Sequence, residues 1–242
     1  MTGELNVPEL NVEVEGGGPA LVLVNGAWCT LRSWDTIVGP LADHFTVIRH
    51  DVRGTGRSAA GPPEENTFEQ FADDIVALAQ SNGFEQFHLW GMAWGARVAL
   101  VTAARQPDRV ARLVLSDLAI DPADVDAQKQ GSVAAKAARS EAGVAEAPKI
   151  AGAFDHDDRD AAGAALLATT KHPDLMPFVE KVVAPTLIAT GDFDPNLESS
   201  RRALGGFADA RLEVLPLTAH GSVLQRPDVA LAAALEFLNS GR

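Results

Sequence analysis

Three short segments contain residue types that cooperate in acyl-transfer chemistry, and each follows an apolar run. Residues 91–95 have the sequence GMAWG, Asp194 follows a second apolar run, and His220 follows a third. A histidine oriented by a carboxylate can act as a general base, and nearby backbone N–H groups can stabilise an oxyanion. The first segment has the spacing of the G-x-Ser-x-G nucleophile turn, with Ala93 at its centre. Because a methyl group cannot attack a substrate, this position predicts altered chemistry.

The segment 91–95 lies between a predicted strand at 87–90 and a predicted helix at 96–105. A strand that turns directly into a helix makes a tight elbow, and glycine is needed where neighbouring backbone comes close. The residue at the apex of such an elbow has a strained backbone and points out of the carboxyl edge of the sheet. It also lies at a helix N-terminus, where free N–H groups favour negative charge.

Strand-like and helix-like runs alternate along the chain, which predicts an α/β fold with a mostly parallel central sheet flanked by helices. We expect strands at 10–15, 20–24, 45–50, 87–90, 111–115, 185–190 and 211–215, and helices at 34–42, 68–80, 96–105 and 229–238. Residues 119–171 interrupt this rhythm. We therefore divide the chain into a core of residues 1–118 and 172–242 and a helical cap or lid insertion of residues 119–171. Small side chains dominate the insertion, which predicts a mobile or shallow lid.

Four motifs occur in a familiar order. They are Asn25-Gly26 with Trp34 nine positions later, the sequence DVRGTGRS at 51–58, the GMAWG elbow, and the loops of Asp194 and His220. In this combination the chain resembles the α/β-hydrolase superfamily, near the small esterases, enol-lactonases and cofactor-free haloperoxidases. The resemblance spans essentially the whole chain and implies an α/β-hydrolase fold, but it specifies no substrate.

The resemblance also implies roles for individual residues. Ala93 occupies the nucleophile position, His220 is the expected base and Asp194 its orienting partner. The backbone N–H groups of Ala27 and Trp94 are expected to form the oxyanion hole.

The sequence departs from the family at two positions, and it offers two candidates for the acid that orients the histidine. Asn25 stands where the family usually has histidine, and Ala93 stands where it has serine. Asp192 competes with Asp194 as the acid, and the family's spacing after Gly191 favours Asp194.

Tryptophans flank the expected oxyanion positions, which predicts a pocket for an apolar or aromatic ligand. The predicted pocket residues are Asn25, Trp28, Trp34 and Trp90.

Three further residues could carry chemistry. A single cysteine such as Cys29 is more often a small packing residue than a nucleophile. Ser58 lies in a turn that also occurs in hydrolases reacting through the elbow residue, so we do not assign it as nucleophile. Asp117 ends a strand that faces the same sheet edge and is a reserve acid.

Alanine at position 93 is compatible with three functions. The first is a serine hydrolase for small esters or lactones that lacks its nucleophile, such as a Ser-to-Ala variant. The second is a natural lyase, isomerase, dehydratase or cyclase that uses His220, Asp194 and the oxyanion hole for proton transfer. The third is an inactive protein that binds a small molecule. Retention of Asp194 and His220 favours the two enzymatic functions over the third.

The composition limits the classes of molecule that the protein is expected to bind. The chain has 33 acidic and 20 basic residues and a net charge of −13, which argues against nucleic acid and anionic membrane surfaces. No cofactor fingerprint or metal-ligand spacing is present, so we expect a small-molecule substrate and neither cofactor nor metal. One cysteine, no apparent signal in residues 1–15 and only short apolar runs predict a cytoplasmic protein. Whether it forms a homo-oligomer stays open.

Overall fold

A seven-stranded sheet forms the centre of the protein, whose computed structural model describes residues 9–172 and 174–240. The spatial order of the strands is β1-β3-β2-β4-β5-β6-β7, and only the β1–β3 pair is antiparallel. The strands are β1 (Val12–Gly16), β2 (Ala20–Val24), β3 (Thr46–His50), β4 (Phe87–Met92), β5 (Val110–Ser116), β6 (Thr186–Gly191) and β7 (Ala210–Leu215). The predicted parallel α/β architecture is therefore confirmed. The predicted absence of a signal concerns residues 1–15, of which 1–8 lie outside the described residues.

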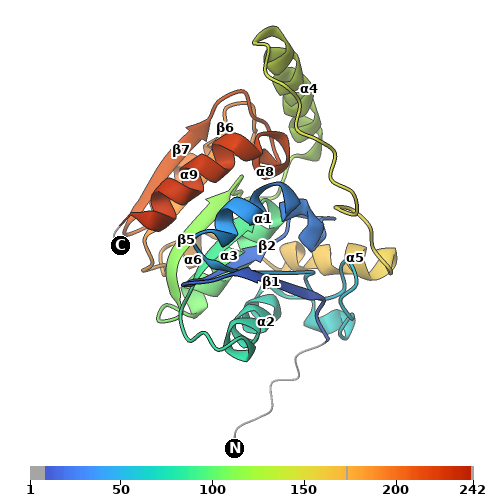
Figure 1. The fold of residues 1–242 in the computed structure, drawn as a ribbon, viewed down its shortest axis with the longest axis vertical. Coiled ribbons are helices and arrows are strands. Elements are labelled where there is room, and N and C mark those ends of the chain that lie inside the picture. The colour runs from blue at the N-terminus through green and yellow to red at the C-terminus, as the bar shows by residue number, and fades with distance from the viewer. Residues whose placement is uncertain (1–8, 173, 241–242) are drawn as a thin grey trace, which may run out of the picture.

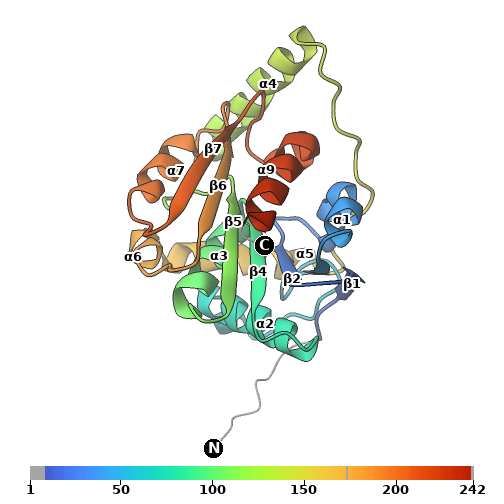
Figure 2. The same ribbon diagram turned by 60° about the vertical axis from the view of Figure 1, so that its left-hand side comes forward.

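Helices cover both faces of the sheet (Figures 1 and 2). The α-helices are α1 (Asp35–Ala42), α2 (Phe68–Ser81), α3 (Trp94–Arg105), α4 (Val125–Glu141), α5 (Arg159–Ala165), α6 (Met176–Val179), α7 (Leu197–Leu204), α8 (Ser222–Gln225) and α9 (Pro227–Asn239). The described residues also form the 3₁₀ helices η1 (Leu31–Trp34), η2 (Pro63–Glu65) and η3 (Leu166–Lys171). The helix expected from Trp34 thus begins as a 3₁₀ turn, which Thr30 caps by accepting a hydrogen bond from Arg32 N.

The strands send alternate side chains into two apolar layers because successive residues of a strand face opposite sides of a sheet. On β4, Leu89 packs with α2 and α3, whereas Trp90 packs with α1 and α9. Both layers are closed to solvent, and β2 is completely buried. Two-sided burial explains why its sequence, ALVLV, shows no polar alternation.

The parallel register brings the carboxyl ends of four strands to one edge. Val24 of β2 pairs with Gly91 of β4, and Met92 of β4 pairs with Ser116 of β5. Ser116 in turn pairs with Ala189 of β6. The loops that leave these ends carry the residues singled out in the sequence. In open α/β sheets, ligands bind at this edge where the strand order reverses, and here β3 and β4 flank β2 on opposite sides.

The chain between β5 and β6 forms α4, an extended stretch, α5, η3 and α6. Helix α4 extends beyond the rest of the molecule in both ribbon views (Figures 1 and 2). Its Arg139 donates hydrogen bonds to Leu217 O at 3.0 Å and Gln225 Oε1 at 3.1 Å, so its C-terminal end is fixed near the loop of His220. The predicted division into core and lid, and the predicted mobility of the lid, remain predictions.

The extended stretch is attached to two loops of the core. Thr30 donates through its backbone N–H to Ala153 O at 2.8 Å and through its hydroxyl to Gly152 O at 2.7 Å. His156 Nδ1 accepts from Gly56 N at 2.7 Å, and its Nε2 lies 3.1 Å from Trp28 O. The carbonyl requires Nε2 to be the donor, which fixes the neutral Nε2–H tautomer. These contacts hold the insertion against the loop that follows β2.

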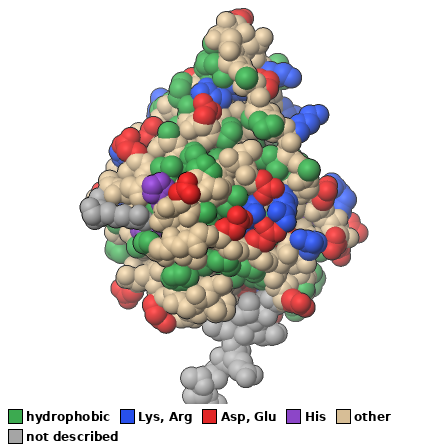
Figure 3. Space-filling view, viewed as in Figure 1, with side chains coloured by type: hydrophobic (Ala, Val, Ile, Leu, Met, Phe, Trp, Pro, Cys, Tyr) green, Lys and Arg blue, Asp and Glu red, His purple; other side chains and the backbone are tan. Residues whose placement is uncertain are grey.

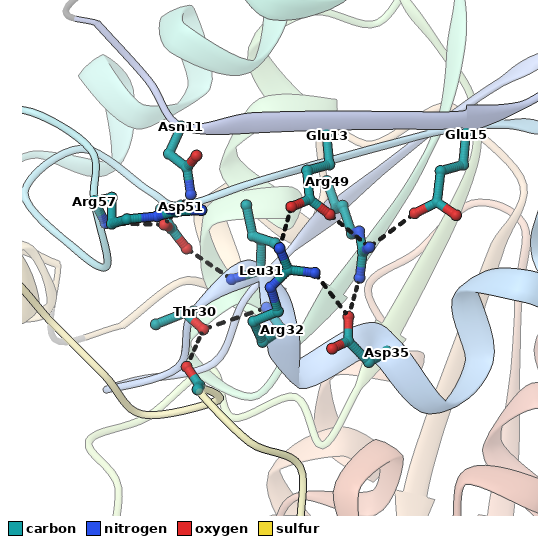
Figure 4. Close-up of polar contacts among 11 residues, drawn as sticks. Asn11, Glu13, Glu15, Thr30, Leu31, Arg32, Asp35, Arg49, Asp51 and Arg57 are labelled. Atoms are coloured by element: carbon teal, nitrogen blue, oxygen red, sulfur yellow. Dashed lines mark hydrogen bonds and ion pairs between the residues drawn. The ribbon is translucent and has the colours of Figure 1, made fainter.

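A network of charged side chains secures the start of the same loop (Figure 4). Asp51 accepts from Leu31 N at 2.7 Å and from Arg57 N at 2.9 Å. The buried Arg49 donates to Glu13 at 2.6 Å and Glu15 at 2.8 Å, and it also pairs with Asp35. A buried guanidinium needs such partners because an unpaired charge is costly in the interior. The network ties β1 and β3 to η1 and α1.

The surface carries charges of both signs. On the face in Figure 3, acidic and basic side chains lie beside one another rather than in large patches of one sign. Within residues 9–172 and 174–240, no helix is long and apolar enough to cross a membrane.

Candidate active site

Strained backbone conformations occur together at the carboxyl edge of the sheet. Among the described residues, four non-glycine residues have positive φ: Trp28, Ala93, Asp117 and Leu217, with φ between 54° and 58°. They lie in the loops that follow β2, β4, β5 and β7. Such conformations cost about 1–3 kcal/mol each and concentrate at functional sites. This edge is therefore the candidate active site.

Ala93 is the apex of the predicted elbow between β4 and α3. Its backbone has φ 54° and ψ −113°, and its N–H donates to Ser116 O at 2.8 Å. Both neighbouring glycines are required by close backbone. A Cβ at Gly91 would lie 2.3 Å from Gly95 O, and one at Gly95 would lie 2.3 Å from Asn25 O. The G-x-x-x-G spacing therefore reflects packing of the elbow against itself and against the end of β2.

Gly95→Ala is expected to destabilise the protein by at least about 2 kcal/mol, because the new methyl group would overlap backbone oxygens of Val24 and Asn25 that cannot move independently. Urea unfolding followed by circular dichroism measures the change. Gly39→Ala in α1 is the matched control, since its Cβ would meet nothing within 4 Å. Equal stability of the two variants would show that the elbow can relax.

His220 and Asp194 come together at this edge. His220 Nδ1 lies 3.1 Å from Asp194 Oδ2, and the Asp194 side chain is completely buried. Asn196 Nδ2 also lies 3.2 Å from Nδ1, but the carboxylate is the stronger partner, so we place the ring proton on Nδ1 facing Asp194. The second ring nitrogen, Nε2, is then unprotonated and has no partner among the described residues, which is the tautomer a general base needs.

The charge around His220 favours its protonated form. Burial alone lowers the pKa of His220, but the hydrogen bond with Asp194 and the negative charges of Asp117 and Asp194 outweigh it and raise this pKa. Arg97 opposes the effect. Proton uptake by His220 is thus stabilised within the site.

Asp192 has a different role from Asp194. Its two oxygens accept from Leu217 N at 3.0 Å and Thr218 N at 2.9 Å. Asp192 therefore shapes the loop that leads to His220, and within the described part of the chain it makes no hydrogen bond with the imidazole ring. Of the two candidate acids, the structure pairs only Asp194 with His220.

The expected oxyanion donors lie in the loops after β2 and β4. Trp94 is the first residue of α3, so its N–H has no acceptor within that helix. Within the described part of the chain, neither Ala27 N nor Trp94 N donates to a protein acceptor. Gly26, in the loop after β2, lies against the turn of Ala93, because a Cβ there would be 3.4 Å from Met92 O and 3.6 Å from Ala93 Cβ.

The four predicted pocket residues divide into two groups. Trp28 is 39% exposed, contacts His156 edge to face at 6.0 Å and carries Arg159 over its ring at 5.4 Å. It therefore stands at the surface between the loop after β2 and the insertion, and its role in a substrate pocket stays a prediction.

Asn25, Trp34 and Trp90 instead lie in the core beneath the site. Trp34 and Trp90 are 0% exposed and contact each other edge to face at 5.3 Å. Trp34 Nε1 donates to Asn25 Oδ1 at 2.8 Å, and Asn25 Nδ2 donates to His50 O at 2.8 Å. We correct the prediction for these three residues: they support the loop of Ala27 from below and do not form an exposed pocket wall.

Two residues set aside in the sequence have structural roles. Cys29 is buried, and burial raises its pKa to about 12, which leaves the thiol unreactive as a nucleophile at neutral pH. Ser58 Oγ donates to Asp51 O at 2.6 Å and accepts from Asn11 N at 2.9 Å, which fixes a turn.

Sequence reasoning did not predict Asn196, which is hydrogen-bonded to both Asp194 and Asp117. Asn196 N donates to Asp194 Oδ1 at 2.9 Å, and Asn196 Nδ2 donates to Asp117 O at 3.2 Å. The signal was the position of Asn196, two residues after the acid, where a side-chain–backbone turn is common.

Comparisons with known proteins agree with this architecture. The family of proteins with the alpha/beta hydrolase fold matches residues 19–147. Over 92% of its length the chain is 30% identical to RutD of Caulobacter sp. (strain K31), a candidate carbamate hydrolase, and the match covers 93% of that protein. The chain belongs to the α/β-hydrolase fold family.

A solved structure is similar along almost the whole chain. The enol-lactonase from Burkholderia xenovorans LB400 superposes with a TM-score of 0.80 and 25% identity, covering 97% of this chain and 98% of that one. Other matches are shorter. The match to the N-formylmaleamate deformylase of Pseudomonas putida is 37% identical but covers 42% of this chain and 38% of that protein. The match to RutD of Agrobacterium fabrum likewise covers 41% of that protein.

Proposed function

We propose that this chain is an α/β-hydrolase for a small, largely apolar ester or lactone in which Ala93 takes the place of the nucleophilic serine. The observation that carries the proposal is the conformation of Ala93. Its strained φ and ψ, between a strand and a helix, are those of a nucleophile elbow, whose apex side chain is aimed out of the sheet edge. A methyl group gains nothing from this strain, whereas a serine hydroxyl would.

The surrounding groups support acyl transfer. With serine at position 93, His220 Nε2 would take the hydroxyl proton while Oγ attacks the substrate carbonyl carbon. The N–H groups of Ala27 and Trp94 would stabilise the oxyanion, and Asp194 would stabilise the imidazolium through Nδ1–H. His220 would then protonate the leaving group, and water would release the acyl group. With alanine present, substrate binding stops before the covalent step.

The proposed substrate class follows from the surroundings of Trp28. The ring is partly exposed beside the loop of Ala27, and the insertion above it is rich in alanine, with Ala161 and Ala162 in α5. These groups suit an uncharged, apolar substrate. The relatives support acyl chemistry in general, since their names describe a carbamate hydrolase, a deformylase and an enol-lactonase. The buried single thiol of Cys29 fits a reducing compartment, so the proposal includes a cytoplasmic location.

Proton-transfer chemistry is the second candidate function. It is favoured by the environment of His220, whose Nε2 has no hydrogen-bond partner within the described residues and whose pKa is raised. A base of this kind, beside free N–H groups that can hold an enolate oxygen, suits a lyase, isomerase, dehydratase or cyclase.

Covalent labelling tests the proposed hydrolase. Ala93→Ser is expected to react with an alkyl fluorophosphonate: the serine oxygen bonds to phosphorus, fluoride leaves, and His220 takes the hydroxyl proton. The protein thereby gains one phosphonyl adduct, while the unaltered chain stays unlabelled. Intact-mass and peptide mass spectrometry measure the adduct and map it to position 93. Labelling elsewhere, or no labelling of the folded Ala93→Ser protein, would contradict the proposal and favour proton transfer.

A further inference from the structure

Asp117 lies in the centre of the candidate site, directly after β5. Its N–H donates to Ala189 O at 2.9 Å, which continues the ladder to β6, and its side chain is 0% exposed. Its φ is 58°, an uncommon conformation for a residue other than glycine. The backbone thus turns sharply at Asp117 and directs a carboxylate into the interior.

The carboxylate holds the chain that follows His220. Asp117 Oδ2 accepts from Gly221 N at 3.1 Å, from Ser222 N at 2.8 Å and from Ser222 Oγ at 2.9 Å. Gly221 has φ 86°, so the chain reverses immediately after His220. Because these bonds start one residue beyond the histidine, they fix the backbone that carries the imidazole ring bonded to Asp194.

Asp117 is also electrostatically joined to the His220–Asp194 pair. Burial and the charge of Asp194 raise the pKa of Asp117 to about 7, while His220 and the bonds from Ser222 oppose the rise. The groups that act on His220 are Asp194, Asp117 and, with opposite sign, Arg97 of α3. Asp117 Oδ1 is buried and has no hydrogen-bond partner among the described residues.

We propose that Asp117 is a positioning residue for His220, which anchors the backbone after the histidine and adds a second buried carboxyl group to the surroundings of the imidazole ring. Two buried carboxyl groups then act on His220 in different ways. Asp194 orients the ring through Nδ1, and Asp117 fixes the loop that carries it. The inference rests on the proposed function only in treating His220 as the base.

An NMR titration of the chain as it exists tests this inference without any turnover. The probe is the His220 Cε1–H resonance, assigned with His220→Ala. Asp117→Asn keeps an acceptor for Gly221 N and Ser222 N but loses the charge, so we expect the pKa of His220 to fall. Asp192→Asn is the matched control, because Asp192 also binds backbone of this loop yet exerts no resolved effect on His220. Its His220 titration should coincide with that of the unaltered chain.

The anchoring role has its own readout. Asp117→Ala should speed amide hydrogen exchange of Gly221 and Ser222 by about tenfold, the equivalent of one lost hydrogen bond, whereas Asp117→Asn should nearly preserve protection. If Asp117→Ala does not fold, Asp117→Asn still decides the question through the titration. An unchanged pKa of His220 in folded Asp117→Asn would overturn the proposal, even if Ala93→Ser proves to be an active hydrolase. The expected shift would support it even if that variant proves inert.

Discussion

Ala93→Ser is expected to raise the hydrolysis of p-nitrophenyl acetate and butyrate by about 10⁴-fold or more over the unaltered chain. The estimate follows from serine hydrolases in general, where loss of the nucleophile costs about 10⁶ in turnover. The described residues supply three of the groups that the proposal needs: the strained elbow, the His220–Asp194 bond and the N–H of Trp94, which donates to no acceptor among them. The serine hydroxyl would complete the set at little structural cost, because it adds one atom to a partly exposed side chain.

The form of the progress curve distinguishes this gain from surface reactivity. A stopped-flow assay should show a burst of p-nitrophenol equal to the enzyme concentration, followed by slower turnover as the acyl-enzyme hydrolyses. Ser58 provides a control, since it is a serine in a fixed turn of the unaltered chain. Ser58→Ala in the Ala93→Ser protein should leave the burst amplitude unchanged. A folded Ala93→Ser protein without a burst on any small ester or lactone would contradict the hydrolase proposal.

Asp194→Asn in the Ala93→Ser protein is expected to reduce kcat by about 10⁴-fold, because an amide in place of the carboxylate favours the wrong imidazole tautomer. It should also move the pH dependence. Since the hydrogen bond with Asp194 raises the pKa of His220, its loss should lower that pKa and shift the acidic limb of the kcat/KM profile to lower pH. The limb belongs to the base form of His220, so activity rises as pH increases through it.

The control for this variant is Asp192→Asn in the same Ala93→Ser protein. Asp192 is exposed and binds Leu217 N and Thr218 N, not the ring of His220. We expect kcat to stay within about tenfold of the parent, because Asp192 does not bond the ring and asparagine keeps one oxygen for the loop backbone, so about one hydrogen bond is lost. Steady-state kinetics from pH 5 to 9 measure both variants. A larger loss from Asp192→Asn than from Asp194→Asn would reverse their assignment.

The fold was predictable because its elements have strong local signals. The apolar run ALVLV marks a strand buried on both faces, and Thr67 marks the start of α2, where its hydroxyl accepts from Gln70 N at 3.0 Å. Ala93, Asp194 and His220 each follow a predicted strand. Because the strands of a parallel sheet end on the same side, the sequence predicts that all three lie at one sheet edge.

What the sequence left open depends on contacts between distant residues. Trp90 lies only three positions before Ala93, but it faces the layer of α1 and α9 because strand side chains alternate, and so it is part of the core. His156 meets Gly56 and Trp28 from a position about a hundred residues away, which no local pattern indicates. The bonds from Gly221 and Ser222 to Asp117 likewise span more than a hundred residues.

The most direct measurement is a double-mutant cycle on burst amplitude with p-nitrophenyl acetate. It compares the unaltered chain, Ala93→Ser, His220→Ala and the combination of both substitutions. If the site is a hydrolase that lacks only its nucleophile, Ala93→Ser alone should give a full burst and the other three should give none, since serine and histidine act as one unit. A full burst in the combined variant, or none in Ala93→Ser, would contradict this account.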